Sequence, residues 1–175
     1  IAAQNVSGET AAITTPVDES DSKIYNTAVW LGGFIASLGG GLFDGAIEVL
    51  EYLTSKYNLH IITNGFQEVQ HGKLEKSKIH SYFKTITNSE MAGVKKPNPI
   101  IFQHALDLAQ AKKEQSIMIG DCLEADVQGA IDFGIEALFF NPNNEISPKG
   151  ITEINHLLEL KNYLYSHQIR LCQHF

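Results

Sequence analysis

The chain has 175 residues, of which 43% are hydrophobic and 19% are charged, so it is long enough for one domain with a buried core. Its formal net charge of −7 argues against general binding to nucleic acid or to an anionic membrane. Two cysteines exclude a disulfide framework, and no apolar run has membrane-spanning length, so we expect a cytoplasmic protein.

The first 41 residues differ in composition from the rest of the chain. Residues 1–22 are rich in Ala, Ser, Thr and acidic residues without periodicity, which predicts a flexible or extended segment. A short buried strand is predicted at 28–31, and a glycine-rich stretch follows it. The stretch 28–42 is faintly similar to a signal-peptide core but has no clear cleavage site. We expect an irregular segment at 1–41, and the start at Ile1 indicates a processed or incomplete product.

From residue 44 onwards, predicted helices and strands alternate. Apolar spacing predicts a helix at 44–57 with Asp44 as its N-cap. Pro97 and Pro99 suit the start of another helix, whose apolar face runs from Phe102 to Ala109. The other expected elements are strands at 59–62, 85–87, 117–119 and 135–140, and helices at 66–77, 123–134 and 154–164. This alternation predicts parallel βαβ units in an α/β core at 42–165, with a tail at 166–175.

Two carboxylates, Asp121 and Asp126, follow the buried strand at 117–119. In an open α/β sheet, the carboxyl ends of the strands form the crevice in which ligands bind. Two neighbouring carboxylates repel each other unless a cation lies between them or one keeps its proton, and oxygen-only ligands favour Mg²⁺. The alternative interpretation is an acidic first turn that suits the helix dipole.

Two further loops carry polar side chains to the same predicted edge. Thr63 and Asn64 follow the strand at 59–62, and Lys96 precedes a helix. A hydroxyl, an ammonium and a carboxylate pair are the groups that a phosphoryl group needs. Taken singly, Thr63 is better explained as a turn former and Lys96 as a surface lysine.

In their order, these segments resemble the haloacid dehalogenase (HAD) superfamily of phosphohydrolases. Ile-Ile-Thr-Asn-Gly at 61–65 is similar to the second family motif, Lys96-Pro97 to the third, and Gly120-Asp121 with Asp126 to the fourth. Residues 61–67 are most similar to the bacterial pyrimidine 5′-nucleotidase branch. The resemblance implies a three-layer Rossmann-like parallel sheet and Mg²⁺-dependent hydrolysis of a small phosphomonoester, such as a nucleotide.

The resemblance also implies a role for each matching residue. The Thr63 hydroxyl and the backbone N–H of Asn64 would bind phosphoryl oxygens. Lys96 would neutralise the phosphoryl group and steady the nucleophile. Asp121 would ligate Mg²⁺, and Asp126 would orient Lys96 or the metal-bound waters.

The chain departs from the family at the first motif, Asp-x-Asp, whose first aspartate is the nucleophile and whose second is the general acid and base. Asp18 and Asp21 have the wrong spacing and follow no strand. The central strand of the family sheet is therefore expected to be missing or replaced, and residues 28–31 are the candidate substitute, without an aspartate. We expect a truncated or impaired phosphohydrolase. The alternatives are a non-catalytic module that binds phosphate and Mg²⁺, and half of a two-chain phosphatase.

The remaining histidines and cysteines have ordinary interpretations. His167, Cys172 and His174 fit no standard zinc spacing. His71 and His80 are expected to face solvent. The sequence leaves the exact substrate and the oligomeric state open.

Overall fold

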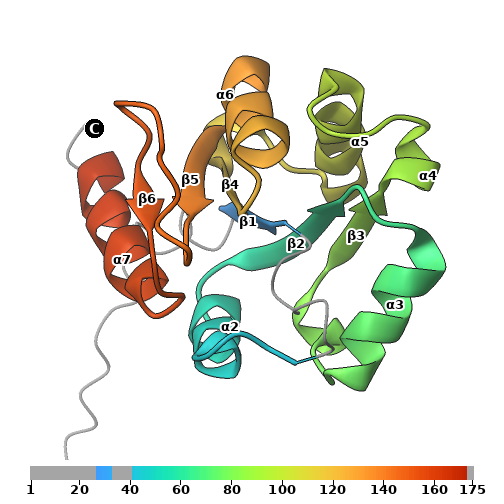
Figure 1. Cartoon of the computed structure of the whole chain (residues 1–175), viewed down its shortest axis with the longest axis horizontal. Coiled ribbons are helices and arrows are strands. Elements are labelled where there is room, and N and C mark those ends of the chain that lie inside the picture. The colour runs from blue at the N-terminus through green and yellow to red at the C-terminus, as the bar shows by residue number, and fades with distance from the viewer. Residues whose placement is uncertain (1–26, 33–40, 173–175) are drawn as a thin grey trace, which may run out of the picture.

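A six-stranded parallel sheet forms the middle layer of the molecule, in the order β3-β2-β1-β4-β5-β6 (Figure 1). The computed structural model describes residues 27–32 and 41–172. The strands are β1 (Ala28–Leu31), β2 (Asn58–Thr63), β3 (Thr85–Asn88), β4 (Ser116–Gly120), β5 (Glu136–Phe140) and β6 (Glu153–Ile154). The predicted α/β class and the parallel sheet are confirmed. The expected segment at 1–22 and the side chains of His167, Cys172 and His174 lie outside the described part.

Helices cover both faces of this sheet, which gives three layers (Figure 1). Buried side chains of α2 (Ala46–Thr54) and α7 (Glu159–Cys172) form one core with the strands, and α5 (Pro99–Ala109) and α6 (Gly129–Phe133) contribute to the other. The remaining helices are α3 (Gln67–Lys76), α4 (Ser89–Ala92), the 3₁₀ turns η2 (His80–Tyr82) and η3 (Lys113–Gln115), and the π-helix η4 (Leu123–Gln128).

The central position of the sheet is filled by β1. This strand pairs in parallel with β2 on one side and with β4 on the other, so that Leu31 lies opposite both Ile61 and Ile119. All its residues are buried, and Val29 and Leu31 enter one core while Trp30 enters the other. Residues 28–31 therefore replace the strand that the sequence left in doubt, and they belong to the core sheet although they precede residue 42.

Three expected helix boundaries are wrong. The N-cap of α2 is Gly45, whose left-handed φ of 74° turns the chain into the helix without a side-chain cap, so Asp44 does not take this place. Ile154 lies in β6, where it pairs with Phe140, and the last helix begins only at Glu159. That helix runs to Cys172, past the boundary predicted at residue 165.

The helix after β4 also differs from a regular α-helix. Residues Leu123–Gln128 form a π-helix, whose wider turn moves later residues around the axis relative to a period of 3.6. Ile131, predicted to lie on the apolar face, is consequently 42% exposed, whereas Val127 and Ala130 are buried. Gly134 closes the helix in the left-handed conformation, as predicted.

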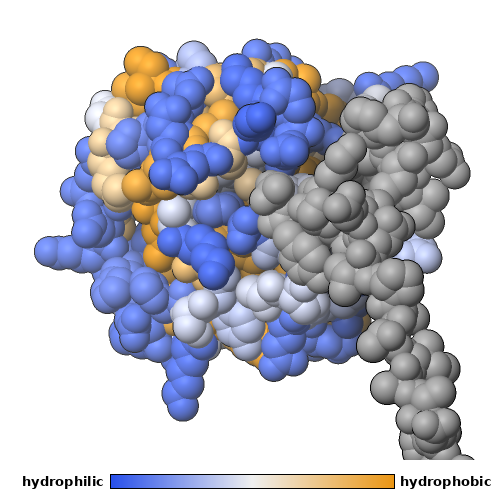
Figure 2. Space-filling model, turned by 180° about the vertical axis from the view of Figure 1, so that it is seen from behind, coloured by the Kyte–Doolittle hydropathy of each residue, from blue (hydrophilic) through white to orange (hydrophobic). Residues whose placement is uncertain are grey.

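The surface of the described part is mainly polar. Figure 2 shows hydrophilic side chains over much of the back face, with hydrophobic atoms in smaller areas between them. Among the helices that the structure describes, none has both the length and the apolar character required to cross a membrane.

Candidate functional site

Three strands bring their carboxyl ends to one edge of the sheet. Because β1 is parallel to both β2 and β4, the residues that follow all three strands meet at this edge (Figure 1). Thr63 ends β2, and Asp121 directly follows β4. The prediction that these two residues share an edge is confirmed.

Lys96 reaches this edge from the loop before α5, and its side chain is only 4% exposed. Its Nζ donates to the backbone carbonyl of Ile62 at 2.7 Å and forms an ion pair with the carboxylate of Asp126. The alternative of a surface lysine is therefore wrong, since the ammonium is buried beneath the end of β2. A buried charge needs such partners, because desolvation would otherwise neutralise it.

The side chain of Asn64 fixes the backbone of Lys96. Its Oδ1 accepts the backbone N–H of Lys96 at 2.7 Å, and its Nδ2 donates to the carbonyl of the same residue at 3.1 Å. Ser89 donates to the Asn64 carbonyl at 3.2 Å, which ties this loop to the start of α4. Sequence reasoning missed this clamp, because it considered only the backbone N–H of Asn64 and no spacing rule connects residues 64 and 96.

Asp126 lies in the first turns of the helix after β4 and is 3% exposed. Its carboxylate accepts the backbone N–H of Cys122 at 3.3 Å besides pairing with Lys96. The carboxylate packs directly on Gly120, where a Cβ would collide with it. Because Gly120 has no side chain, it leaves room at the end of β4 for the carboxylate of Asp126 to pair with Lys96.

Asp121 is the exposed member of the acidic pair. Partial burial of its carboxylate raises the pKa of Asp121 above the ordinary value, and the neighbouring Asp126 raises it further. The carboxylate of Asp126 is buried in its ion pair with Lys96, whereas the carboxylate of Asp121 remains open to solvent. Oxygen donors with excess negative charge fit Mg²⁺, which keeps several waters and needs only one or two carboxylates.

Thr63 is 3% exposed, and its hydroxyl oxygen accepts the backbone N–H of Gly65 at 3.0 Å. This is the local interaction of a turn former, so that interpretation of Thr63 is correct. Its role toward a phosphoryl oxygen stays a prediction.

The end of β1 carries no acidic side chain at the described position that follows it. Gly32 succeeds Leu31, is buried, and donates its N–H to the carbonyl of Ile119 at 2.8 Å. The register places Gly32 one step beyond the Leu31–Ile61 and Leu31–Ile119 pairs, beside the ends of β2 and β4. The two acids at positions 18 and 21 lie outside the described residues.

Comparison with known proteins relates the chain to hydrolases. The family model for haloacid dehalogenase-like hydrolases matches residues 40–140. Pyrimidine 5′-nucleotidase YjjG of Escherichia coli is 34% identical over 127 residues, which cover 70% of this chain and 56% of YjjG. Pyrimidine 5′-nucleotidase PynA of Streptococcus pneumoniae is 33% identical over 113 residues, covering 63% of this chain and 48% of PynA.

Solved structures give the same result. The crystal structure of the HAD-hydrolase YfnB of Bacillus subtilis, bound to magnesium, superposes with a TM-score of 0.67 at 33% identity. The superposition covers 72% of this chain and 56% of YfnB. The chain thus spans about half the length of the curated relatives it matches.

Proposed function

Because the chain belongs to the family of haloacid dehalogenase-like hydrolases, we propose that its site binds a small phosphomonoester together with Mg²⁺. The observation that carries this proposal is the buried pair of Lys96 and Asp126 at the carboxyl edge of the sheet, with the exposed Asp121 beside it. Buried charges with close partners at the ligand-binding edge of an α/β sheet are candidates for a functional site.

Each residue has one part in the proposed binding. Lys96 provides the positive charge for the phosphoryl group, and Asp126 holds the ammonium in position. The Thr63 hydroxyl and the backbone N–H of Asn64 bind phosphoryl oxygens at the end of β2. Asp121 ligates the metal directly. Bound Mg²⁺ would neutralise phosphoryl charge and orient the phosphoryl group.

The names of the relatives support the substrate class that we propose. YjjG and PynA are named as pyrimidine 5′-nucleotidases, whereas other relatives are named N-acylneuraminate-9-phosphatase and glyceraldehyde 3-phosphate phosphatase. These names share only the phosphomonoester. We therefore propose a phosphomonoester as the ligand and pyrimidine nucleoside monophosphates as the first compounds to test.

We propose further that hydrolysis by this chain is strongly impaired. Lys96 and Asp121 can bind and polarise a phosphoryl group, but Gly32 offers no carboxylate to accept it. This favours the alternative of a module that binds without turnover. For the two-chain alternative, β1 already pairs with both β2 and β4, so a strand from another chain would have to displace it.

Binding of inorganic phosphate, measured by isothermal titration calorimetry with and without Mg²⁺, tests the proposal. We expect Lys96→Met to abolish binding while circular dichroism shows that the variant is still folded, because the charge that faces the phosphate is lost. Lys95→Met is the matched control, since Lys95 is the exposed neighbour with the same charge. Equal loss in the two variants, or binding that neither affects, would contradict the proposed site.

A further inference from the structure

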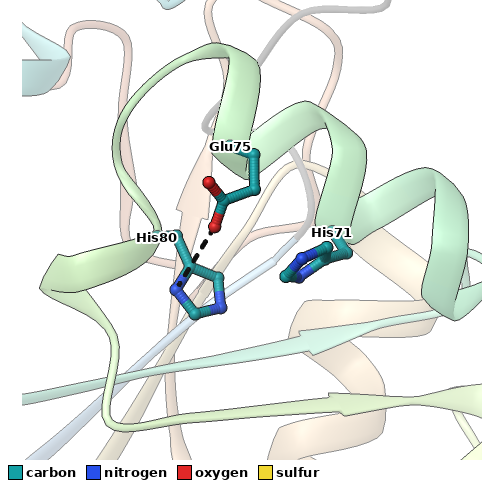
Figure 3. A group of neighbouring side chains, drawn as sticks. All are labelled: His71, Glu75 and His80. Carbon is teal, nitrogen blue, oxygen red and sulfur yellow. Dashed lines mark ion pairs between the residues drawn. The ribbon is translucent and has the colours of Figure 1, made fainter.

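A second group of candidate metal ligands lies on α3 and the turn that follows it, away from the residues of the proposed phosphate site. Within the described residues, His71, Glu75 and His80 each place one ligand atom within 4.8 Å of the other two. Figure 3 shows His71 and Glu75 projecting from the same side of the helix and His80 facing them from the segment that follows. We propose that these three side chains bind one divalent transition-metal ion, such as Zn²⁺.

The backbone brings the three residues together. His71 and Glu75 are four residues apart in α3, so they are neighbours on one helix face. The chain then reverses through Lys78, whose φ of 55° is left-handed, and this turn returns His80 to that face. The lysines of the helix, Lys73 and Lys76, fall on other faces because their spacing from His71 differs from three or four.

The distances require only small side-chain movements to accept a metal. Nδ1 of His80 already lies 3.8 Å from Oε1 of Glu75, and the His71 and His80 rings are 5.2 Å apart between centroids. Ligand atoms of a tetrahedral zinc ion are separated by about 3.3 Å when each bond is about 2.0–2.1 Å long. The side chains of His80 and Glu75 are 43% and 58% exposed, so both can change rotamer without disturbing the core.

The ligand set selects the class of metal. Two imidazoles and one carboxylate suit Zn²⁺, Co²⁺ or Ni²⁺, whereas Mg²⁺ prefers oxygen ligands alone. Three protein ligands also leave a coordination position for water, as in the open zinc sites of enzymes. This site is therefore chemically distinct from the proposed Mg²⁺ site at Asp121, which uses oxygen donors.

The metal would connect α3 to the segment that follows it. Leu74 is the one buried residue of α3, and the helix has no continuous apolar face. His80 belongs to η2, which leads into β3. An ion bound by His71, Glu75 and His80 would fix the end of α3 to the start of that strand.

Zinc titration of the full chain against a chromophoric chelator tests the proposal, with visible absorption of the Co²⁺ form as a report of coordination. We expect one bound equivalent, which excess Mg²⁺ does not displace. His71→Gln, Glu75→Gln and His80→Gln should each weaken Zn²⁺ binding by about tenfold or more. His156→Gln and Glu68→Gln are the matched controls, because both residues are exposed and lie outside the group.

Two further measurements make the result unambiguous. Zn²⁺ should raise the thermal unfolding midpoint of the wild type and leave that of His71→Gln/His80→Gln unchanged, while phosphate binding stays the same in both. Absence of Zn²⁺ binding would overturn the proposal. So would binding that persists in the three ligand variants and disappears when His167, Cys172 and His174 are replaced.

Discussion

Replacing Lys96 with methionine should destabilise the fold by about 3–5 kcal/mol, because it breaks a buried ion pair from one side. Methionine keeps an apolar side chain of similar length but removes the ammonium. The Asp126 carboxylate, which is only 4% exposed, would keep the backbone N–H of Cys122 as its hydrogen-bond donor. The carbonyl of Ile62 would lose its bond to Lys96 as well.

The chain contains a control pair of the same chemical type. Lys161 and Glu48 are joined at 2.6 Å, but their side chains are 26% and 64% exposed. Water screens this pair, so Lys161→Met should cost less than about 1 kcal/mol. The difference between the two lysine variants measures the effect of burial at comparable distance.

Urea denaturation of the wild type and the variants provides the free energies of unfolding. In a double-mutant cycle, Lys96→Met and Asp126→Asn together should cost clearly less than the sum of the two single changes, since each alone leaves the other group unpaired. If Lys96→Met costs no more than Lys161→Met, or if the two changes at the site are additive, burial does not strengthen the pair of Lys96 and Asp126.

Three further predictions concern the same region and the sheet beneath it. Asp121→Asn should abolish the Mg²⁺ response of the chain in an NMR titration, and an identical response in wild type and variant would remove Asp121 as the ligand. Gly120→Ala should cost about 1–3 kcal/mol in urea denaturation, because the added Cβ collides with Asp126. Burial, aided by Lys84, lowers the pKa of His60 from 6.5 to about 4. The folded state therefore favours the neutral imidazole, and stability should be complete above pH 6.5 and fall by about 3 kcal/mol as the pH drops to about 4. Urea denaturation midpoints of the wild type should therefore fall more between pH 6.5 and pH 4 than those of His60→Gln.

The sequence predicted the sheet and its functional edge because the strands are short apolar runs that end in polar loops. The strand at 117–119 is the clearest case, because the sequence changes from apolar residues to the carboxylate of Asp121 within two residues of its end, and Asp126 follows. The family resemblance then connected these acids to Thr63 and Lys96. The parallel topology alone predicted that Thr63 and Asp121 lie at the same edge of the sheet.

Other features depend on contacts that leave no pattern in the sequence. The clamp between the Asn64 side chain and the Lys96 backbone joins residues 32 apart. The π-helix at 123–128 displaces Ile131 from its expected face, and the spacing of apolar residues did not predict this π-helix. His71 is exposed as expected and His80 is partly exposed, but the sequence did not predict that the left-handed turn at Lys78 brings the two rings together.

Steady-state hydrolysis of p-nitrophenyl phosphate and of pyrimidine nucleoside monophosphates in the presence of Mg²⁺ tests whether the site binds a phosphoryl group without turning it over. We predict phosphate binding without robust turnover, since the sequence has no Asp-x-Asp motif and loss of general acid–base catalysis alone costs ~10²–10⁴-fold. Robust turnover that Lys96→Met eliminates and Lys95→Met retains would contradict it. The chain would then contain another nucleophile, and Asp18, Asp21 and Asp44 would be the acids to replace first.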